Sequence, residues 1–201
     1  LSVDLKSTVR RATSDNVLAL LPGTTRKDET VVYMGHWDHL GRSFGSPDGD
    51  NIYNGAIDNA TGTAALLEIA EAYATLPQAP RRSVLFLAVT AEEQGLLGSL
   101  HYAANPLFPL ENTVGGLNMD GMNNVGATRD ITVIGYGASE LDDYLRRAAA
   151  RQGRMVVQEP TPEKGFYYRS DHFNLAKAGV PMLYTKSGID SPTLGAEYGK
   201  Q

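Results

Sequence analysis

Short runs of apolar and β-branched residues recur along the chain, separated by polar or glycine-rich segments. Runs that show no alternation of apolar and polar residues are typical of strands buried on both faces of a sheet. We therefore predict one central sheet. Its six strands are expected at residues 17–21, 31–34, 84–89, 116–119, 131–134 and 181–184.

Helical periodicity lies between these runs. Asn59 is a suitable N-cap for a helix that continues to about residue 76, with Ala64, Leu67 and Ala70 on one face. Two further helical segments are expected at residues 140–152 and 171–178. Strands that alternate with helices predict an α/β fold, a three-layer sandwich in which helices cover both faces of a mostly parallel, mixed sheet.

No repeat or Pro/Gly/Ser-rich linker divides the chain, so residues 1–201 are expected to form a single domain. The loop-like final run, 191–201, predicts that a C-terminal segment of the parent protein is missing. Residues 41–55 are rich in Gly, Asp and Asn, and they predict a long loop of the kind that is often functional.

Composition narrows the chemistry. The formal charge is −5 and basic residues do not cluster, so nucleic acid is not an expected partner. No apolar run approaches the roughly 18 residues that a membrane span requires, so no membrane partner is expected either. Cysteine is absent, which excludes disulfides and thiolate ligands, so any metal must be held by histidine and carboxylates.

Several predicted strands run directly into acidic residues or histidine. Ligands of open α/β sheets bind beyond the carboxyl ends of the strands, so these side chains are expected to meet at one edge. A carboxylate is also favourable at a helix N-terminus. The residues concerned are His36 after the second strand, Glu92 and Glu93 after the third, Asp120 after the fourth, and Asp58 just before the first helix.

Any one of these residues alone is more often a turn former or a structural residue. Together they form a cluster of carboxylates, which repel one another unless cations neutralise them. A pair of zinc ions about 3.5 to 4 Å apart would do so. Because consecutive residues that leave a strand point in different directions, one residue of the Glu92-Glu93 pair can bind metal while its neighbour acts as a general base.

These motifs resemble those of a known family, the zinc aminopeptidases, which share a two-metal site with glutamate carboxypeptidases and glutaminyl cyclases. The resemblance covers about residues 14 to 187, and the motifs occur in the family's order. They are GHWDHLG (35–41), AIDNATGTAALLEIA (56–70), TAEEQGLLGS (90–99), NMDG (118–121) and RSDHFNLAKAGVP (169–181). The resemblance implies a catalytic peptidase domain.

The resemblance also implies a role for each matching residue. Asp58 is expected to bridge two zinc ions, His36 and Asp120 to complete one of them, and Glu93 to bind the other. Glu92 is expected to be the general base.

Two further residues have expected roles beside the metals. Asp38 lies two residues from His36 and is expected to accept a hydrogen bond from the imidazole nitrogen that does not bind metal; a turn or N-cap is the alternative. Tyr167 matches a tyrosine that hydrogen-bonds the developing oxyanion in relatives. Its neighbour Tyr168 is the alternative for that role.

The remaining histidines are expected to lie outside the metal site. In relatives, the last ligand of the ion bound by Glu93 is a histidine after the strand at 181–184, and no histidine follows His172 here. That ligand is therefore predicted to lie beyond Gln201, leaving one complete metal position and one incomplete one. His39 and His101 are expected to be structural.

The expected activity is that of a zinc-dependent aminopeptidase on peptides with a free N-terminus. A secreted or periplasmic bacterial parent, with possible additional domains, is part of what the resemblance implies. The alternatives are a one-zinc glutaminyl cyclase-like enzyme, a carboxypeptidase acting on acidic C-terminal residues, and a non-catalytic receptor-like domain. His36 favours the two-metal site, because a one-zinc site does not require it.

Overall fold

The computed structural model describes residues 2–43, 49–196 and 198. Its centre is a seven-stranded sheet with the strand order β1-β3-β2-β4-β7-β5-β6. The six predicted strands are all present, and β6 is an additional short strand. The strands are β1 (Val17–Leu21), β2 (Arg26–His36), β3 (Arg82–Val89), β4 (Thr113–Asn118), β5 (Asp130–Ile134), β6 (Met155–Gln158) and β7 (Met182–Ser187).

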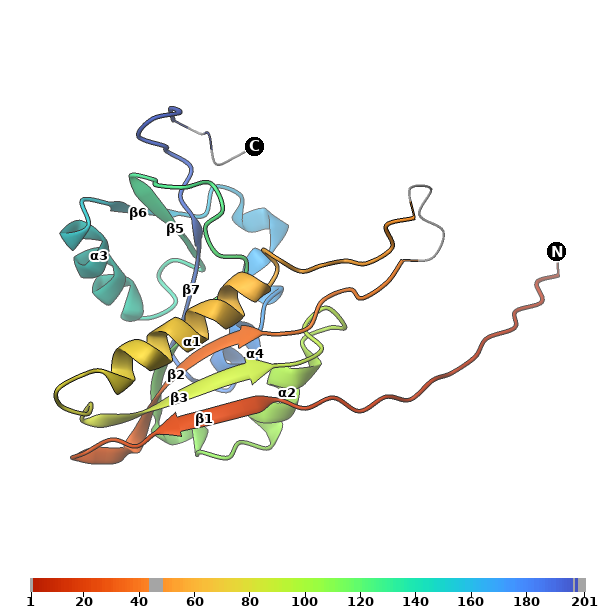
Figure 1. Ribbon diagram of the computed structural model, residues 1–201, viewed down its shortest axis with the longest axis horizontal. Helices are drawn as coiled ribbons and strands as arrows, with labels where there is room; N and C mark the ends of the chain where they lie inside the picture. Colours follow the sequence, from red (N-terminus) through yellow and green to blue (C-terminus); the bar gives the residue numbers. More distant parts are fainter. Residues whose placement is uncertain (1, 44–48, 197, 199–201) are drawn as a thin grey trace.

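The sheet is mixed and mostly parallel, as predicted. Its central strands β3, β2, β4 and β7 are parallel to one another, and β6 is parallel to β5. The antiparallel pairs are β1 with β3 and β5 with β7. Because β3, β2 and β4 are adjacent and parallel, their carboxyl ends lie side by side at one edge of the sheet, as Figure 1 shows for β2 and β3.

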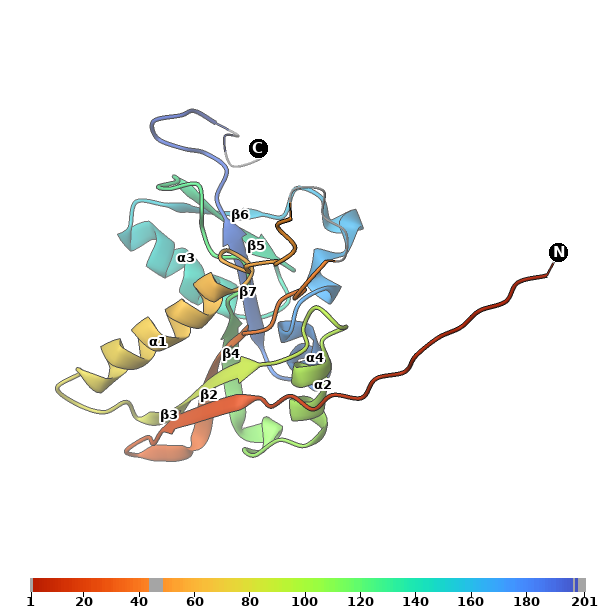
Figure 2. The same ribbon diagram turned by 45° about the vertical axis from the view of Figure 1, so that its right-hand side comes forward.

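Helices cover both faces of the sheet (Figures 1 and 2). The helices α1 (Ala60–Ala74) and α3 (Leu141–Arg151) lie on one face, and α2 (Leu97–Ala104) and α4 (His172–Lys177) lie on the other. Three short 3₁₀ turns complete the elements: η1 (Leu110–Asn112), η2 (Pro162–Lys164) and η3 (Phe166–Tyr168). This arrangement confirms the three-layer α/β sandwich.

Apolar side chains from the strands pack against the helices on each face. On the face of α2 and α4, Met34 and Leu87 of the sheet are fully buried in one cluster with Tyr102 and Leu175. This cluster lies directly behind the carboxyl ends of β2 and β3. Close packing there makes the strand ends rigid supports for the residues that follow them.

The buried face of α1 differs from the predicted one. Asn59 caps the helix as expected, but Leu67 is 69% exposed while Leu66 is buried against Val84 and Phe86. The helix has the predicted position but is rotated by about one residue, since consecutive leucines do not reveal which of the two faces the sheet.

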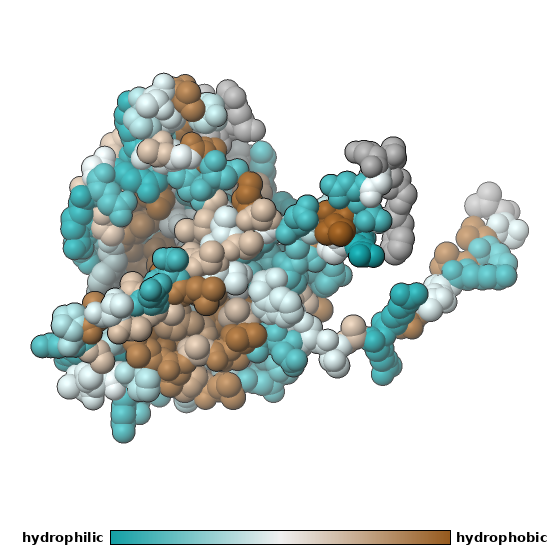
Figure 3. Space-filling view, in the orientation of Figure 1, coloured by the Kyte–Doolittle hydropathy of each residue, from teal (hydrophilic) through white to brown (hydrophobic). Residues whose placement is uncertain are grey.

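Two segments extend beyond the sandwich. Residues 2–16 form an extended arm that joins the sheet at β1, and residues 37–43 and 49–59, between β2 and α1, also project outward (Figure 1). Part of the predicted 41–55 loop, residues 44–48, lies outside the described residues, as do 197 and 199–201 of the final run. On the face that carries α1, apolar surface gathers between this helix and the edge strand β1 (Figure 3). Among the described residues, no helix combines the length and apolar character needed to cross a membrane.

Candidate metal centre

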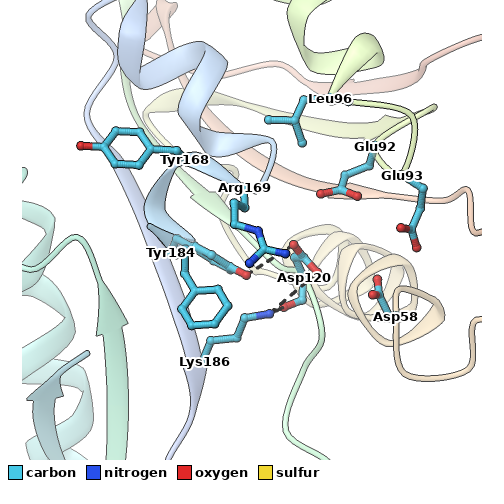
Figure 4. Close-up of a pocket in the computed structure, with 11 residues that line it drawn as sticks. Asp58, Glu92, Glu93, Leu96, Asp120, Tyr168, Arg169, Tyr184 and Lys186 are labelled. Atoms are coloured by element: carbon cyan, nitrogen blue, oxygen red, sulfur yellow. Dashed lines mark hydrogen bonds and ion pairs between the residues drawn. The ribbon is translucent and has the colours of Figure 1, made fainter. Parts of the chain in front are cut away.

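The carboxyl ends of β2, β3 and β4 bring the predicted metal-binding residues together, and Figure 4 shows the carboxylates among them. His36 is the last residue of β2, Asp120 lies two residues beyond β4, and Asp58 lies two residues before α1. Glu92 and Glu93 occupy the turn after β3. The four carboxylates line one cavity of about 650 Å³.

His36 faces two of these carboxylates across distances that suit a shared cation. Its Nε2 atom lies 3.0 Å from Oδ1 of Asp58 and 3.6 Å from Oδ1 of Asp120. Two ligands of one tetrahedral zinc ion, each about 2.1 Å from the metal, lie roughly 3.4 Å apart. The Nε2 atom is buried and has no hydrogen-bond partner among the described residues. A zinc ion fits this donor set and would satisfy the buried nitrogen.

The possible metal donors form two groups, and the donor atoms within each group lie within 4.8 Å of one another. One group is His36, Glu92 and Asp120, and the other is His39, Asp58 and Glu93. Asp58 belongs to the second group, yet it also lies 3.0 Å from His36 of the first. Its carboxylate therefore stands between the two groups, where a bridging ligand would lie.

His39 lies inside the site, which corrects the expectation that it is only structural. Its Nδ1 atom is 2.6 Å from Oε1 of Glu93. This is a direct contact, shorter than the spacing of two ligands around one ion. His39 therefore lies directly against the Glu93 carboxylate, although neither of the two contacting atoms has a hydrogen-bond partner among the described residues. Its position three residues after His36, in the loop that leaves β2, was the signal in the sequence.

Asn59 joins the segments that carry the metal donors. Its side-chain amide donates hydrogen bonds to the carbonyls of His36 (3.2 Å) and Met119 (2.9 Å), and its oxygen accepts from the N–H groups of Gly62 (3.0 Å) and Gly121 (3.1 Å). A β-carbon at Gly62 would collide with the Met119 carbonyl, so glycine allows α1 to approach β4 this closely. The sequence predicted the cap but not this wider network.

Asp38 has a different role from the predicted one. The Nδ1 atom of His36 faces the backbone carbonyl of Asp38 at 3.1 Å, while the Asp38 carboxylate is 3.7 Å away. That carboxylate instead accepts the backbone N–H groups of Glu92 (3.0 Å) and Glu93 (3.3 Å). The carbonyl can fix the imidazole tautomer that leaves Nε2 free for a metal, and the carboxylate holds the turn that carries both glutamates.

Asp120 is surrounded by groups that favour its ionised form. Ser170 Oγ donates to Oδ2 at 2.5 Å, the Tyr184 hydroxyl approaches the same oxygen at 3.4 Å, and Lys186 Nζ donates to the backbone carbonyl at 2.9 Å. Burial alone would raise the pKa of Asp120, but His36, Lys186 and Ser170 together lower it to about 2. The sequence analysis assigned no role to Ser170, Tyr184 or Lys186.

The crowded carboxylates also change the protonation of two neighbouring groups. Burial alone would lower the pKa of His36, but Asp120 and Glu92 outweigh it and raise that pKa to about 9. Burial raises the pKa of Glu92 to about 8, against an opposing effect of His36. A divalent cation among these groups would lower both pKa values, because it favours the neutral imidazole and the ionised carboxylate.

Tyr167 does not reach the cavity that the carboxylates line. Its ring packs edge-on against His172, with centroids 4.9 Å apart, and it lines a separate cavity at the ends of β5 and β6. Tyr168 borders both cavities, but its hydroxyl points away from Asp120 (Figure 4). The structure therefore gives no support to the predicted oxyanion role of Tyr167, since η3 directs that ring toward α4.

His172 and His101 lie outside both donor groups, as expected. His172 begins α4, is fully buried and packs against Tyr184 with centroids 4.6 Å apart. Neither of its ring nitrogens has a hydrogen-bond partner among the described residues. Burial lowers the pKa of His172 to about 4, so this ring is neutral at pH 7. His101 is exposed on α2.

A mostly parallel α/β sheet that gathers histidine and carboxylate donors beyond its strand ends defines a candidate metal-binding α/β domain. The chain belongs to peptidase family M28, whose model matches residues 16–198. That match includes every donor residue described above. The resemblance inferred from the motifs is confirmed.

Known proteins similar to the chain agree with this membership. The chain is 35% identical over 123 residues to aminopeptidase NAALADL1 of Mus musculus, and the match covers 59% of this chain and 15% of that protein. It is 32% identical over 142 residues to a probable zinc metalloprotease of Pyricularia oryzae, covering 68% and 28%. The structure of BSAP, a zinc aminopeptidase from Bacillus subtilis, shares the fold with a TM-score of 0.65 at 22% identity, covering 91% and 43%. The chain spans less than half the length of each of these proteins.

Proposed function

We propose that this protein is a zinc-dependent aminopeptidase that removes residues from the free N-terminus of peptides. The observation that carries the proposal is the convergence of His36, Asp58 and Asp120, with Nε2 of the buried imidazole 3.0 and 3.6 Å from the two carboxylates. The relatives whose names include zinc and aminopeptidase support the same activity.

The donor residues would hold two zinc ions. His36 and Asp120 would bind one ion, Glu93 the other, and Asp58 would bridge them, while His39 would orient Glu93. When bound, zinc supplies a Lewis acid that polarises the substrate carbonyl and lowers the pKa of water. The absence of cysteine leaves nitrogen and oxygen donors, a set that suits catalytic zinc.

Glu92 would move the proton. Its carboxylate lies in the donor group with His36 and Asp120 and points in a different direction from that of Glu93 (Figure 4). The hydrogen bond from its N–H to Asp38 holds its backbone in place. A carboxylate with a pKa near neutrality can accept a proton from the attacking water and donate it to the leaving amine.

The acidic cavity also suits a substrate with a free amine. Carboxylates form the polar lining on one side, and a carboxylate oxygen that does not bind a metal can accept a hydrogen bond from the amine of a peptide N-terminus. A volume of about 650 Å³ accommodates a small ligand or the first residues of a peptide.

Replacement of Glu92, the proposed general base, tests the mechanism. We expect Glu92→Gln in the zinc-loaded protein to lower kcat by at least about 100-fold, with zinc content unchanged because the amide leaves the main ligands in place. The matched control is Glu71→Gln, an exposed position on α1, which should behave as wild type. Wild-type turnover by the Glu92 variant would contradict the assignment.

The direction of cleavage is tested with blocked dipeptides. An N-acetylated dipeptide should resist hydrolysis, because it lacks the amine that the carboxylates recognise, whereas its C-terminally amidated counterpart should be cleaved. The opposite pattern would indicate a carboxypeptidase on the same scaffold.

A further inference from the structure

The cavity that holds the carboxylates also has a basic side, formed by Arg169 and Lys186 (Figure 4). Lys186 is already engaged, because its Nζ donates to the carbonyl of Asp120 at 2.9 Å. Within the described part of the chain, the guanidinium of Arg169 takes part in none of the ion pairs. Its donors are therefore available to a ligand, although carboxylates line the same cavity.

Local contacts support the position of Arg169, an exposed residue at the side of the cavity. Its guanidinium carbon lies over the ring of Phe166, 5.4 Å from the centroid, and its backbone N–H donates to the Phe166 carbonyl at 3.1 Å. The next residue, Ser170, donates to Asp120 at 2.5 Å and so ties this segment to the metal centre. Stacking on an aromatic face leaves the edges of a guanidinium, where its N–H donors lie, open to the cavity.

The charge balance of the cavity points to an anionic ligand group, and this step rests on the proposed two-zinc function. Two zinc ions carry four positive charges, which equal the four negative charges of Asp58, Glu92, Glu93 and Asp120. Arg169 and Lys186 then leave the loaded cavity net positive. A substrate that carried only a positive amine would leave this charge uncompensated.

We propose that Arg169 binds a carboxylate of the substrate, so that the protein prefers peptides with a carboxylate close to the bond that is cleaved. A guanidinium presents two parallel N–H donors that match the two oxygens of a carboxylate. The carboxylate has two possible sources, the C-terminus of a dipeptide or an acidic side chain beside the scissile bond. Arg169 is then a specificity-determining residue.

Peptide binding tests this assignment without relying on turnover. The zinc-loaded Glu92→Gln protein is titrated calorimetrically with leucyl-alanine, leucyl-alanine amide and leucyl-aspartate amide. We expect at least one of the two carboxylate peptides to bind roughly ten-fold or more tightly than leucyl-alanine amide. The peptide that shows the preference identifies the source of the carboxylate.

Substitution of the arginine completes the test. In Arg169→Gln, the carboxylate peptide and leucyl-alanine amide should bind with about equal affinity. Arg169→Lys should retain part of the preference for the carboxylate peptide. The matched control is Arg147→Gln, which removes an exposed arginine stacked on Tyr144 in α3, outside the cavity, and it should retain the full preference.

A preference that is absent, or that Arg169→Gln leaves intact, overturns the inference, as does a failure of all three peptides to bind. Turnover of the same peptides with Glu92 intact is measured separately. If no peptide is cleaved while the Arg169-dependent preference persists, the aminopeptidase proposal fails and the carboxylate site stands.

Discussion

The two donor groups at the sheet edge are built in different ways. In the first, His36 and Asp120 lie at or just beyond strand ends, and their side chains are only 1% and 11% exposed. In the second, Asp58, His39 and Glu93 lie on loops and turns, and their side chains are 53%, 22% and 17% exposed. Backbone hydrogen bonding of the sheet positions His36 and Asp120, while contacts between loops position the second group. Glu92, the third member of the first group, lies in the same turn as Glu93.

This difference predicts unequal metal sites. The buried Asn59 amide donates hydrogen bonds to the carbonyls of His36 and Met119, and these bonds hold the backbone next to the first group in place. The second group depends on Asp38, which holds the glutamate turn, and on the contact of His39 with Glu93. A preorganised site binds metal with less reorganisation, so we expect the zinc ion held by His36 to bind more tightly.

The largest expected effect follows from removing the buried nitrogen donor. His36→Asn should weaken zinc binding at the first group by more than about 100-fold, because loss of a direct ligand exceeds the roughly 10- to 100-fold typical of an indirect partner. Competition with a chelator and zinc content per chain measure this loss. The control His101→Asn changes an exposed histidine outside both groups. Equal zinc retention by the two variants would contradict the difference between the sites.

Asp38→Asn should affect catalysis more than metal content. It removes the carboxylate that accepts the N–H groups of Glu92 and Glu93, so the general base loses its alignment. We expect kcat to fall about 10- to 100-fold with near-normal zinc content. Asp28→Asn, at an exposed position on β2, is the control. Loss of zinc in parallel with kcat would show that Asp38 serves the metals instead.

His39→Gln tests the second donor group alone. Without the contact at 2.6 Å, Glu93 is less ordered, and the second zinc ion should bind about ten-fold more weakly while the first is unaffected. Zinc titration resolves the two binding steps. Equal weakening of both steps would mean that His39 supports the whole turn.

The smallest expected effect is the contribution of the buried His172, which packs against Tyr184, to the pH dependence of the protein's stability. The pKa of His172 is about 4 in the folded protein, below its ordinary 6.5, so the unfolded chain takes up this proton first. The stabilisation is complete above pH 6.5 and is lost as the pH falls toward 4. Between pH 6.5 and 5.5 the free energy of unfolding should fall by about 1 kcal/mol from this group.

The measurement compares wild type with His172→Phe, which keeps an aromatic ring but cannot titrate. Urea unfolding at the two pH values should give a drop that is smaller in the variant by this amount. An identical pH dependence in both proteins would show that His172 is not neutral in the fold.

The sequence predicted best where local rules decide the structure. Buried strands appear as unbroken apolar runs, and adjacent parallel strands place their carboxyl ends together, so His36, Asp120 and the glutamate turn could be assigned to one edge. The residue pattern also placed Asn59 at the start of α1, because a side-chain acceptor is required there.

Side-chain directions in loops and turns could not be predicted in the same way. The sequence does not show that η3 turns Tyr167 toward His172, that Asp38 accepts from the glutamate turn, or that the ring of His39 reaches Glu93. The contacts of Asp38 and His39 join segments more than 50 residues apart, whose relative positions arise only when the layers pack, and the direction of Tyr167 depends on the irregular turn between η3 and α4.

The amino-acid sequence by itself determined the three layers, the family and every donor except His39, because periodicity within each element and short motifs identify these features. Only the tertiary structure decided which donor is buried, which is exposed, and that Arg169 shares their cavity. The physical reason is that burial and electrostatic environment belong to the packed molecule, where separate segments exclude water together.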